Sequence, residues 1–69
     1  MNLKTLLTVA QALPGSTREI ESRTGITKST VHRALTELKA PIPRGFGIEL
    51  DDAGQVIDWG LINPKKIQA

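Results

Sequence analysis

A glycine at position 25 divides two segments in which apolar residues recur at the spacing of a helix. Ile20 is the main apolar residue of the segment before it, which is too short to be a stable helix on its own in water. Ile26 follows the glycine directly, and the next segment carries an apolar stripe made of Val31, Ala34, Leu35 and Leu38. Because glycine adopts left-handed backbone conformations that other residues avoid, Gly25 predicts a sharp turn between two helices that pack on each other.

Residues that favour helix ends mark the limits of these two helices. Ser16 and Glu19 have the spacing of a capping box, in which each side chain accepts a hydrogen bond from a backbone N–H group at a helix start. Thr27 is a suitable N-cap for the second helix, and Pro41 stops that helix from continuing. The sequence therefore predicts a short helix after Ser16 and a longer one from about Lys28 to Lys39.

The rest of the chain predicts one more helix and a β-hairpin. Near the N-terminus, apolar residues at helical spacing define an amphipathic helix: Leu3, Leu6, Leu7, Ala10 and Leu13. Later, the alternating run Ile48–Leu50 and the β-rich pair Val56-Ile57 flank the turn signal Asp51–Gly54. Three helices followed by a hairpin is the α+β architecture of a three-helix winged helix-turn-helix with a C-terminal β-hairpin wing.

The chain is short, with 69 residues and no cysteine. A chain of this size buries only about 60% of the surface that its unfolded form exposes, which leaves no room for a deep pocket. We therefore expect no enzyme activity, no cofactor, no metal site and no small-molecule ligand. No apolar run is long enough for a membrane span or a signal peptide, so we expect an intracellular, cytoplasmic protein without membrane contacts. Residues 1–62 are expected to form one domain, and residues 63–69 a polar, flexible tail.

The charges are unevenly distributed along the chain, although the net charge is only +2. Residues 1–46 carry seven Lys or Arg and three Glu, whereas residues 47–62 carry four acidic residues and no Lys or Arg. A basic face that excludes the acidic segment would attract the phosphates of a nucleic acid. An ordinary mixed surface explains the same charges equally well.

The stretch TREIESRTGITKSTVHRALTEL, residues 17–38, is the main reason to expect DNA binding. A fixed crossing of two helices leaves one face of the second helix exposed, and such a face fits the major groove of B-DNA, which is about 12 Å wide. The segment TGITKSTVHRALTEL resembles the recognition-helix region of IclR-type transcriptional regulators. The resemblance covers about a third of the chain and implies a winged-helix DNA-binding domain without that family's effector-binding domain. PIPRGFGIEL, past Ala40, is similar to the wing of biotin-repressor-type domains.

This resemblance implies that the exposed residues at the start and along one face of the longer helix contact DNA: Thr27, Lys28, Ser29, Thr30, His32, Arg33 and Thr36. Arg33 is the best candidate for a bidentate contact with guanine, worth about 1–3 kcal/mol of discrimination. Lys28 would reach a phosphate or a guanine edge, the hydroxyls of the first turn suit a phosphate, and Thr36 would contact a thymine methyl group or a phosphate. Arg18 and Arg44 would contact the DNA backbone.

Two features depart from the usual form of this motif. Glu21 stands on the side of its helix that approaches the next one, where the motif usually has a small residue. Its side chain therefore either leans out to solvent or pairs with a basic neighbour. Asp51 and Asp52 lie at the tip of the expected wing, where DNA phosphates would repel them. Either this wing stays off the DNA, or the earlier turn at Arg44-Gly45 makes the contact.

Several residues admit a second interpretation. His32 is more simply a solvated or DNA-facing side chain than a metal ligand, because no cysteine is present and no carboxylate lies four residues further on. Asp51 and Asp52 fit a turn better than a catalytic pair. Trp59 fits the core better than a stacking platform for single-stranded nucleic acid. The pair Lys65-Lys66 is either a solvated tail or a clamp for a phosphate.

The function that we expect is sequence-specific binding of double-stranded DNA, with a role in transcriptional regulation. A single domain of this size buries only about 600–1,000 Å² on DNA, so we expect a homodimer on adjacent half-sites. Two other functions stay open. One is a winged helix used for protein contacts, which the acidic hairpin favours. The other is a DNA-binding component of a replication, recombination or transposition complex.

Overall fold

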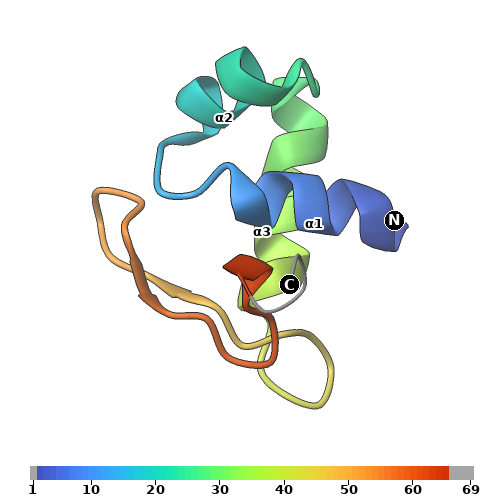
Figure 1. Cartoon of the computed structure of the whole chain (residues 1–69), viewed down its shortest axis with the longest axis vertical. Helices are drawn as coiled ribbons and strands as arrows, with labels where there is room; N and C mark the ends of the chain where they lie inside the picture. The colour runs from blue at the N-terminus through green and yellow to red at the C-terminus, as the bar shows by residue number, and fades with distance from the viewer. Residues whose placement is uncertain (1, 66–69) are drawn as a thin grey trace.

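The computed structural model describes residues 2–65, which form an α+β fold of three helices and a two-stranded antiparallel hairpin (Figure 1). The elements are α1 (Leu3–Gln11), α2 (Thr17–Thr24), α3 (Lys28–Lys39), β1 (Glu49–Leu50) and β2 (Val56–Asp58). Helix α1 crosses in front of α3, α2 packs at one end of α3, and the hairpin lies to one side of the other end (Figure 1). The order of elements expected from the sequence is confirmed, although β1 is only two residues long.

The ends of the first two helices follow from local hydrogen bonds. Asn2 starts α1, because its side-chain oxygen accepts a hydrogen bond from the backbone N–H of Thr5 at 2.9 Å. The capping box at the start of α2 is confirmed, with Ser16 and Glu19 each accepting a hydrogen bond from the other's backbone N–H. Gly25 ends α2 in the left-handed conformation, with φ of 76°, as its place between the two helices predicts.

The core is built around α3. Its whole apolar stripe is buried: Val31, Ala34, Leu35 and Leu38. Helix α1 covers this stripe with Leu6, Val9 and Ala10, and α2 contributes Ile20, which is completely buried. Burial of a large aliphatic side chain stabilises a fold by about 1.5–3 kcal/mol, so packing outweighs local helix propensity in holding these short helices in place.

The hairpin pairs Glu49 with Asp58 and Leu50 with Val56, with an irregularity in register between the two pairs. Its turn is closed by Asp51, whose Oδ1 accepts hydrogen bonds from the backbone N–H groups of Ala53 and Gln55, both at 2.9 Å. This is the backbone hydrogen bonding for which aspartate is favoured in turns. The interpretation of Asp51 as a turn residue is therefore confirmed.

The segment after β2 returns to the core. Ile62 is buried, whereas its neighbour Leu61 is 66% exposed. Trp59 is half-buried and packs against the core cluster, as expected for a core residue. Pro64, in the segment expected to be a tail, is also buried. Lys65 is exposed, and residues 66–69 of the expected tail lie outside the described residues.

Candidate nucleic-acid interface

Helix α3 presents a polar face opposite its buried stripe. The residues that the sequence assigned to DNA lie on this face or at the start of the helix. Exposed among them are Thr27, Lys28, Ser29, His32, Arg33 and Thr36, whereas Thr30 is half-buried. Because the stripe on the other side is held by the core, the orientation of the polar face toward solvent is fixed. The helix is a rigid support for these side chains.

Four of these residues come together around one open hollow in the surface. Lys28, Ser29, His32 and Arg33 line it, and Thr17 from the start of α2 completes it. Thr17 was not among the contacts expected from the sequence. The signal was available, because Thr17 follows the capping residue Ser16 and so lies in the first turn of α2. Arg18, its exposed neighbour, extends the polar surface along α2.

Thr36 lies along the helix in a second hollow with Arg33, Glu37 and Ala40. Arg33 therefore borders both hollows and links the predicted contacts into one surface. The hydroxyl of Thr36 donates a hydrogen bond to the carbonyl of His32 at 2.9 Å, which fixes its orientation. Its oxygen lone pairs and its methyl group stay available to an outside partner.

Glu21 is exposed to solvent, one of the two arrangements expected from the sequence, and it makes a contact that the sequence did not predict. Its side chain points across the turn to α3, where Oε2 accepts a hydrogen bond from the backbone N–H of Lys28 at 2.7 Å. Its partner is the backbone N–H of Lys28 and not a basic side chain. Sequence spacing alone does not reveal this contact, because the two residues are seven positions apart and meet only once the turn is formed.

Arg44 lies apart from the first hollow. It is exposed on the loop after α3, and the next residue, Gly45, donates a backbone hydrogen bond to Pro41 at 3.0 Å. A Cβ atom at Gly45 would lie 2.5 Å from the carbonyl oxygen of Glu37, so this loop packs on the last turn of α3. The hollow with Lys28 is at the opposite end of the helix, and the structure does not bring Arg44 into it.

The tip of the hairpin lies against the connection between α1 and α2 (Figure 1). The backbone N–H of Gly15 donates a hydrogen bond to the carbonyl of Gly54 at 3.2 Å. Asp51 and Asp52 line a polar cleft with residues from this connection, and Thr17 belongs to this cleft as well as to the first hollow. The acidic turn therefore flanks the polar surface of α2 and α3.

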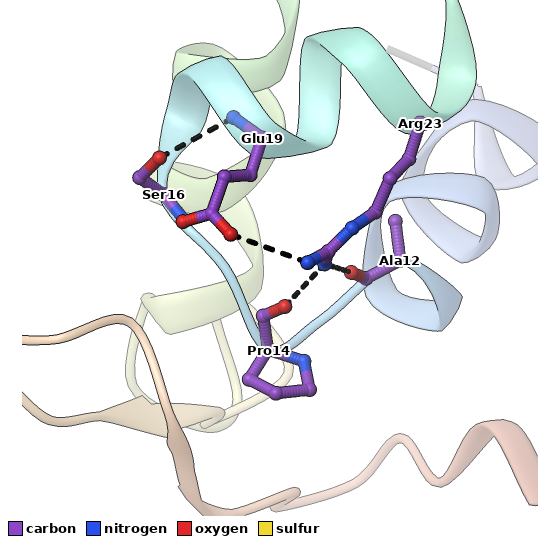
Figure 2. Close-up of polar contacts among 5 residues, drawn as sticks. All are labelled: Ala12, Pro14, Ser16, Glu19 and Arg23. Carbon is purple, nitrogen blue, oxygen red and sulfur yellow. Dashed lines mark hydrogen bonds and ion pairs between the residues drawn. The ribbon is translucent and has the colours of Figure 1, made fainter.

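One basic residue of the N-terminal segment, Arg23, is held by hydrogen bonds to neighbouring groups of the fold. Arg23 donates hydrogen bonds from Nη1 to the carbonyls of Ala12 and Pro14, and from Nη2 to Oε2 of Glu19 at 3.3 Å (Figure 2). The pKa of Glu19 is held below its ordinary value of 4.5, chiefly by the backbone N–H of Ser16, then by the Ser16 hydroxyl and the charge of Arg23. The guanidinium of Arg23 therefore holds the connection between α1 and α2, and it is paired with Glu19.

No protein-family model, curated protein or solved structure matches the chain. The likeness to IclR-type regulators therefore depends on the residues of the sequence alone. Among residues 2–65, no three His, Cys, Asp or Glu side chains are grouped so that they could hold a metal ion. Within the same residues, no helix combines the length and the apolar character that a membrane crossing requires.

Proposed function

We propose that the chain is a winged helix-turn-helix domain that binds double-stranded DNA, with α3 in the major groove. The observation that carries the proposal is the hollow on the polar face of α3. Four residues selected from the sequence for direct DNA contact surround it together, on a helix whose opposite face is buried. An α-helix fits the major groove, and a rigidly held face is what reading a base sequence requires.

Within this proposal the polar residues contact different parts of the DNA. Arg33, which borders both hollows, forms the bidentate contact with a guanine. Lys28 and Ser29, in the first turn of α3, contact a phosphate or a base edge, and Thr17 and Arg18 hold the neighbouring phosphate from α2. One domain of this size covers only about 600–1,000 Å² of DNA, so the proposal includes two copies on adjacent half-sites and a role in transcriptional regulation.

Selection of bound sequences from a random DNA pool tests this proposal. The expected result is an enriched palindrome with half-sites separated by about one helical turn of DNA, 10–10.5 base pairs. Binding to a labelled duplex is then measured at low and at high salt, because phosphate contacts weaken steeply as salt increases. Absence of binding at low salt would contradict the proposal. If the chain binds the pool without preferring any sequence, the DNA-binding part of the proposal stands and the base-reading part is contradicted.

A protein-binding function is the second candidate, and the hairpin end of the molecule favours it. Ile42, Ile57 and Leu61 are each more than half exposed, and they belong to the hairpin and its flanking loops. The turn of the hairpin is acidic. The salt titration together with the sequence selection separates the candidates, because a protein-binding module is not expected to prefer any duplex sequence. A DNA-binding component of a replication, recombination or transposition complex would share the DNA affinity, and it would differ in the proteins that accompany it.

A further inference from the structure

Glu21 holds both ends of the turn between α2 and α3. Its backbone carbonyl accepts a hydrogen bond from the N–H of Gly25 at 2.8 Å, where α2 ends. Its side-chain carboxylate accepts a hydrogen bond from the N–H of Lys28 at 2.7 Å, where α3 begins. A single residue therefore binds the C-cap residue of one helix and the first residue of the next. The direction in which α3 leaves the turn depends on this pair of bonds.

The carboxylate of Glu21 caps the start of α3, which the side chain of the N-cap residue Thr27 does not do. Thr27 has the extended backbone of an N-cap, but its side chain makes no capping hydrogen bond and instead donates to the hydroxyl of Thr30 at 2.9 Å. The first N–H groups of a helix have no partner within the helix and carry partial positive charge, which favours a negatively charged acceptor. Glu21 supplies that acceptor from the neighbouring helix.

The same carboxylate lies beside the proposed DNA interface. Lys28, whose backbone it binds, lines the first hollow, and Thr17 of that hollow lies one helical turn before Glu21 on α2. A helix N-terminus is a position where phosphates bind readily. Here an internal negative charge already holds the first N–H group of α3, and the side chain is exposed, so it would face any phosphate that approaches this point.

We propose that Glu21 positions the DNA-reading helix and determines specificity, by taking the place of a DNA phosphate at the start of α3. The inference rests on the proposed function. Binding to random DNA depends almost entirely on phosphate contacts, whereas binding to the preferred site also uses base contacts. The carboxylate of Glu21 keeps a phosphate away from the backbone N–H of Lys28, while the side chains of Lys28 and Ser29 stay free to contact DNA. Its negative charge therefore weakens binding to random DNA more than binding to the preferred site.

The substitution Glu21→Gln isolates the charge from the contact. The amide oxygen of glutamine accepts the same hydrogen bond but carries no charge. We expect the affinity of this variant for a random-sequence duplex to rise about threefold at low salt, as removal of one repulsive charge near the phosphates implies. Its affinity for the selected duplex is expected to rise less, so the ratio of the two affinities falls. Glu49→Gln is the matched control, since Glu49 is exposed on β1 and its replacement leaves the ratio unchanged.

A measurement without DNA tests the contact itself. In the NMR spectrum of the free full chain, the amide proton of Lys28 is expected to be protected from exchange and shifted downfield. Protection is retained in Glu21→Gln and in Glu49→Gln, and it is lost in Glu21→Ala. An unprotected Lys28 amide in the unaltered chain would overturn the positioning role while leaving the proposed function intact.

The DNA measurement has two further outcomes. An equal rise on both duplexes in Glu21→Gln would overturn the role in specificity. If the unaltered chain does not distinguish the selected duplex from random DNA, the proposed function itself fails, and the inference about specificity fails with it. The amide measurement tells these cases apart, because it reports on the contact whether or not DNA binds.

Discussion

Arg33 is the residue on which base reading most depends in the proposed function. It borders both hollows of the polar face, and its flat guanidinium group matches the two acceptors of a guanine. We expect Arg33→Ala to weaken binding to the selected duplex by about 1–3 kcal/mol, and to weaken binding to random DNA much less. Fluorescence anisotropy with the two labelled duplexes measures both affinities. Arg44→Ala is the control, because a phosphate contact affects the two duplexes equally. Equal losses in Arg33→Ala would exclude base reading by this residue.

Arg23 has a structural task, although the sequence alone groups it with the other basic residues. Its hydrogen bonds to the carbonyls of Ala12 and Pro14 hold the connection between α1 and α2. Since the side chain is 47% exposed, solvent screens part of the interaction, and we expect Arg23→Ala to lower the free energy of unfolding by about 1–2 kcal/mol. Urea denaturation measures this change. Arg18→Ala, an exposed control on the same helix, is expected to stay within about 0.5 kcal/mol of the parent. A similar loss in both variants would show that the carbonyl contacts contribute nothing.

Glu19 makes stability depend on pH in acid. Its pKa in the folded chain lies below the ordinary value of 4.5, with the backbone N–H of Ser16 as the main cause. A lowered folded-state pKa contributes stability that is fully present above the unfolded value and is lost as pH falls through the folded value. The difference in unfolding free energy between the parent and Glu19→Gln should therefore shrink as pH is lowered from neutral to below 4.5. Urea titrations over this range provide the measurement, and a difference independent of pH would refute the assignment.

At the scale of elements, local signals predicted the helices and missed the contacts between elements. The capping box at Ser16 and the left-handed turn at Gly25 involve neighbours in sequence, so residue type and spacing were sufficient. The contact of Glu21 with Lys28 and that of Gly15 with Gly54 involve groups brought together by folding, and no periodicity encodes them. The hollow on α3 was predictable except for Thr17, because one helix face supplies the other four residues.

The docking of the hairpin on the α1–α2 connection can be tested by comparing alanine substitutions at two glycines. Gly54 and Gly25 both have positive φ, of 80° and 76°, so alanine is strained at either position. A Cβ at Gly54 would lie 2.5 Å from the carbonyl oxygen of Gly15, whereas a Cβ at Gly25 meets nothing within 4 Å. We expect Gly25→Ala to lower the unfolding free energy by about 1 kcal/mol, and Gly54→Ala to lower it further. Faster amide exchange at Gly15 should accompany only Gly54→Ala. Equal losses with unchanged exchange would mean that the hairpin tip is not held there.

For the molecule as a whole, the charge pattern of the sequence needs a correction that only the fold supplies. Residues 1–46 carry an excess of basic groups, but Arg23 is engaged internally and Arg44 lies at the far end of α3. The cations that remain for the first hollow are Lys28 and Arg33, which line it, and the exposed Arg18, which follows the lining residue Thr17 on α2. The sequence gives the number of charged residues directly. It does not reveal which of them face outward together, because that depends on which side chains form hydrogen bonds within the folded chain.

This smaller set of cations predicts the salt dependence of binding. If each of the three cations neutralises at most one phosphate, the logarithm of the affinity should fall with the logarithm of the salt concentration with a slope of about −2 to −3 per domain. Anisotropy titrations between about 50 and 200 mM salt measure this slope. Arg18→Ala is expected to make it shallower by about one unit, and Arg23→Ala should leave it unchanged. A slope that Arg23→Ala alters as much as Arg18→Ala would place Arg23 at the DNA.

The bond between Gly15 and Gly54 has a consequence for engineering this domain. It joins the connection before α2 to the turn of the hairpin, so that each of these two segments holds the other in place. The hairpin is therefore not an interchangeable module that can be deleted or grafted while the helices keep their arrangement. A truncated chain that ends after α3 would lose the buried side chains of Ile48 and Ile62 from the core and free the N–H of Gly15. Attempts to miniaturise or recombine the domain should retain the chain through Pro64.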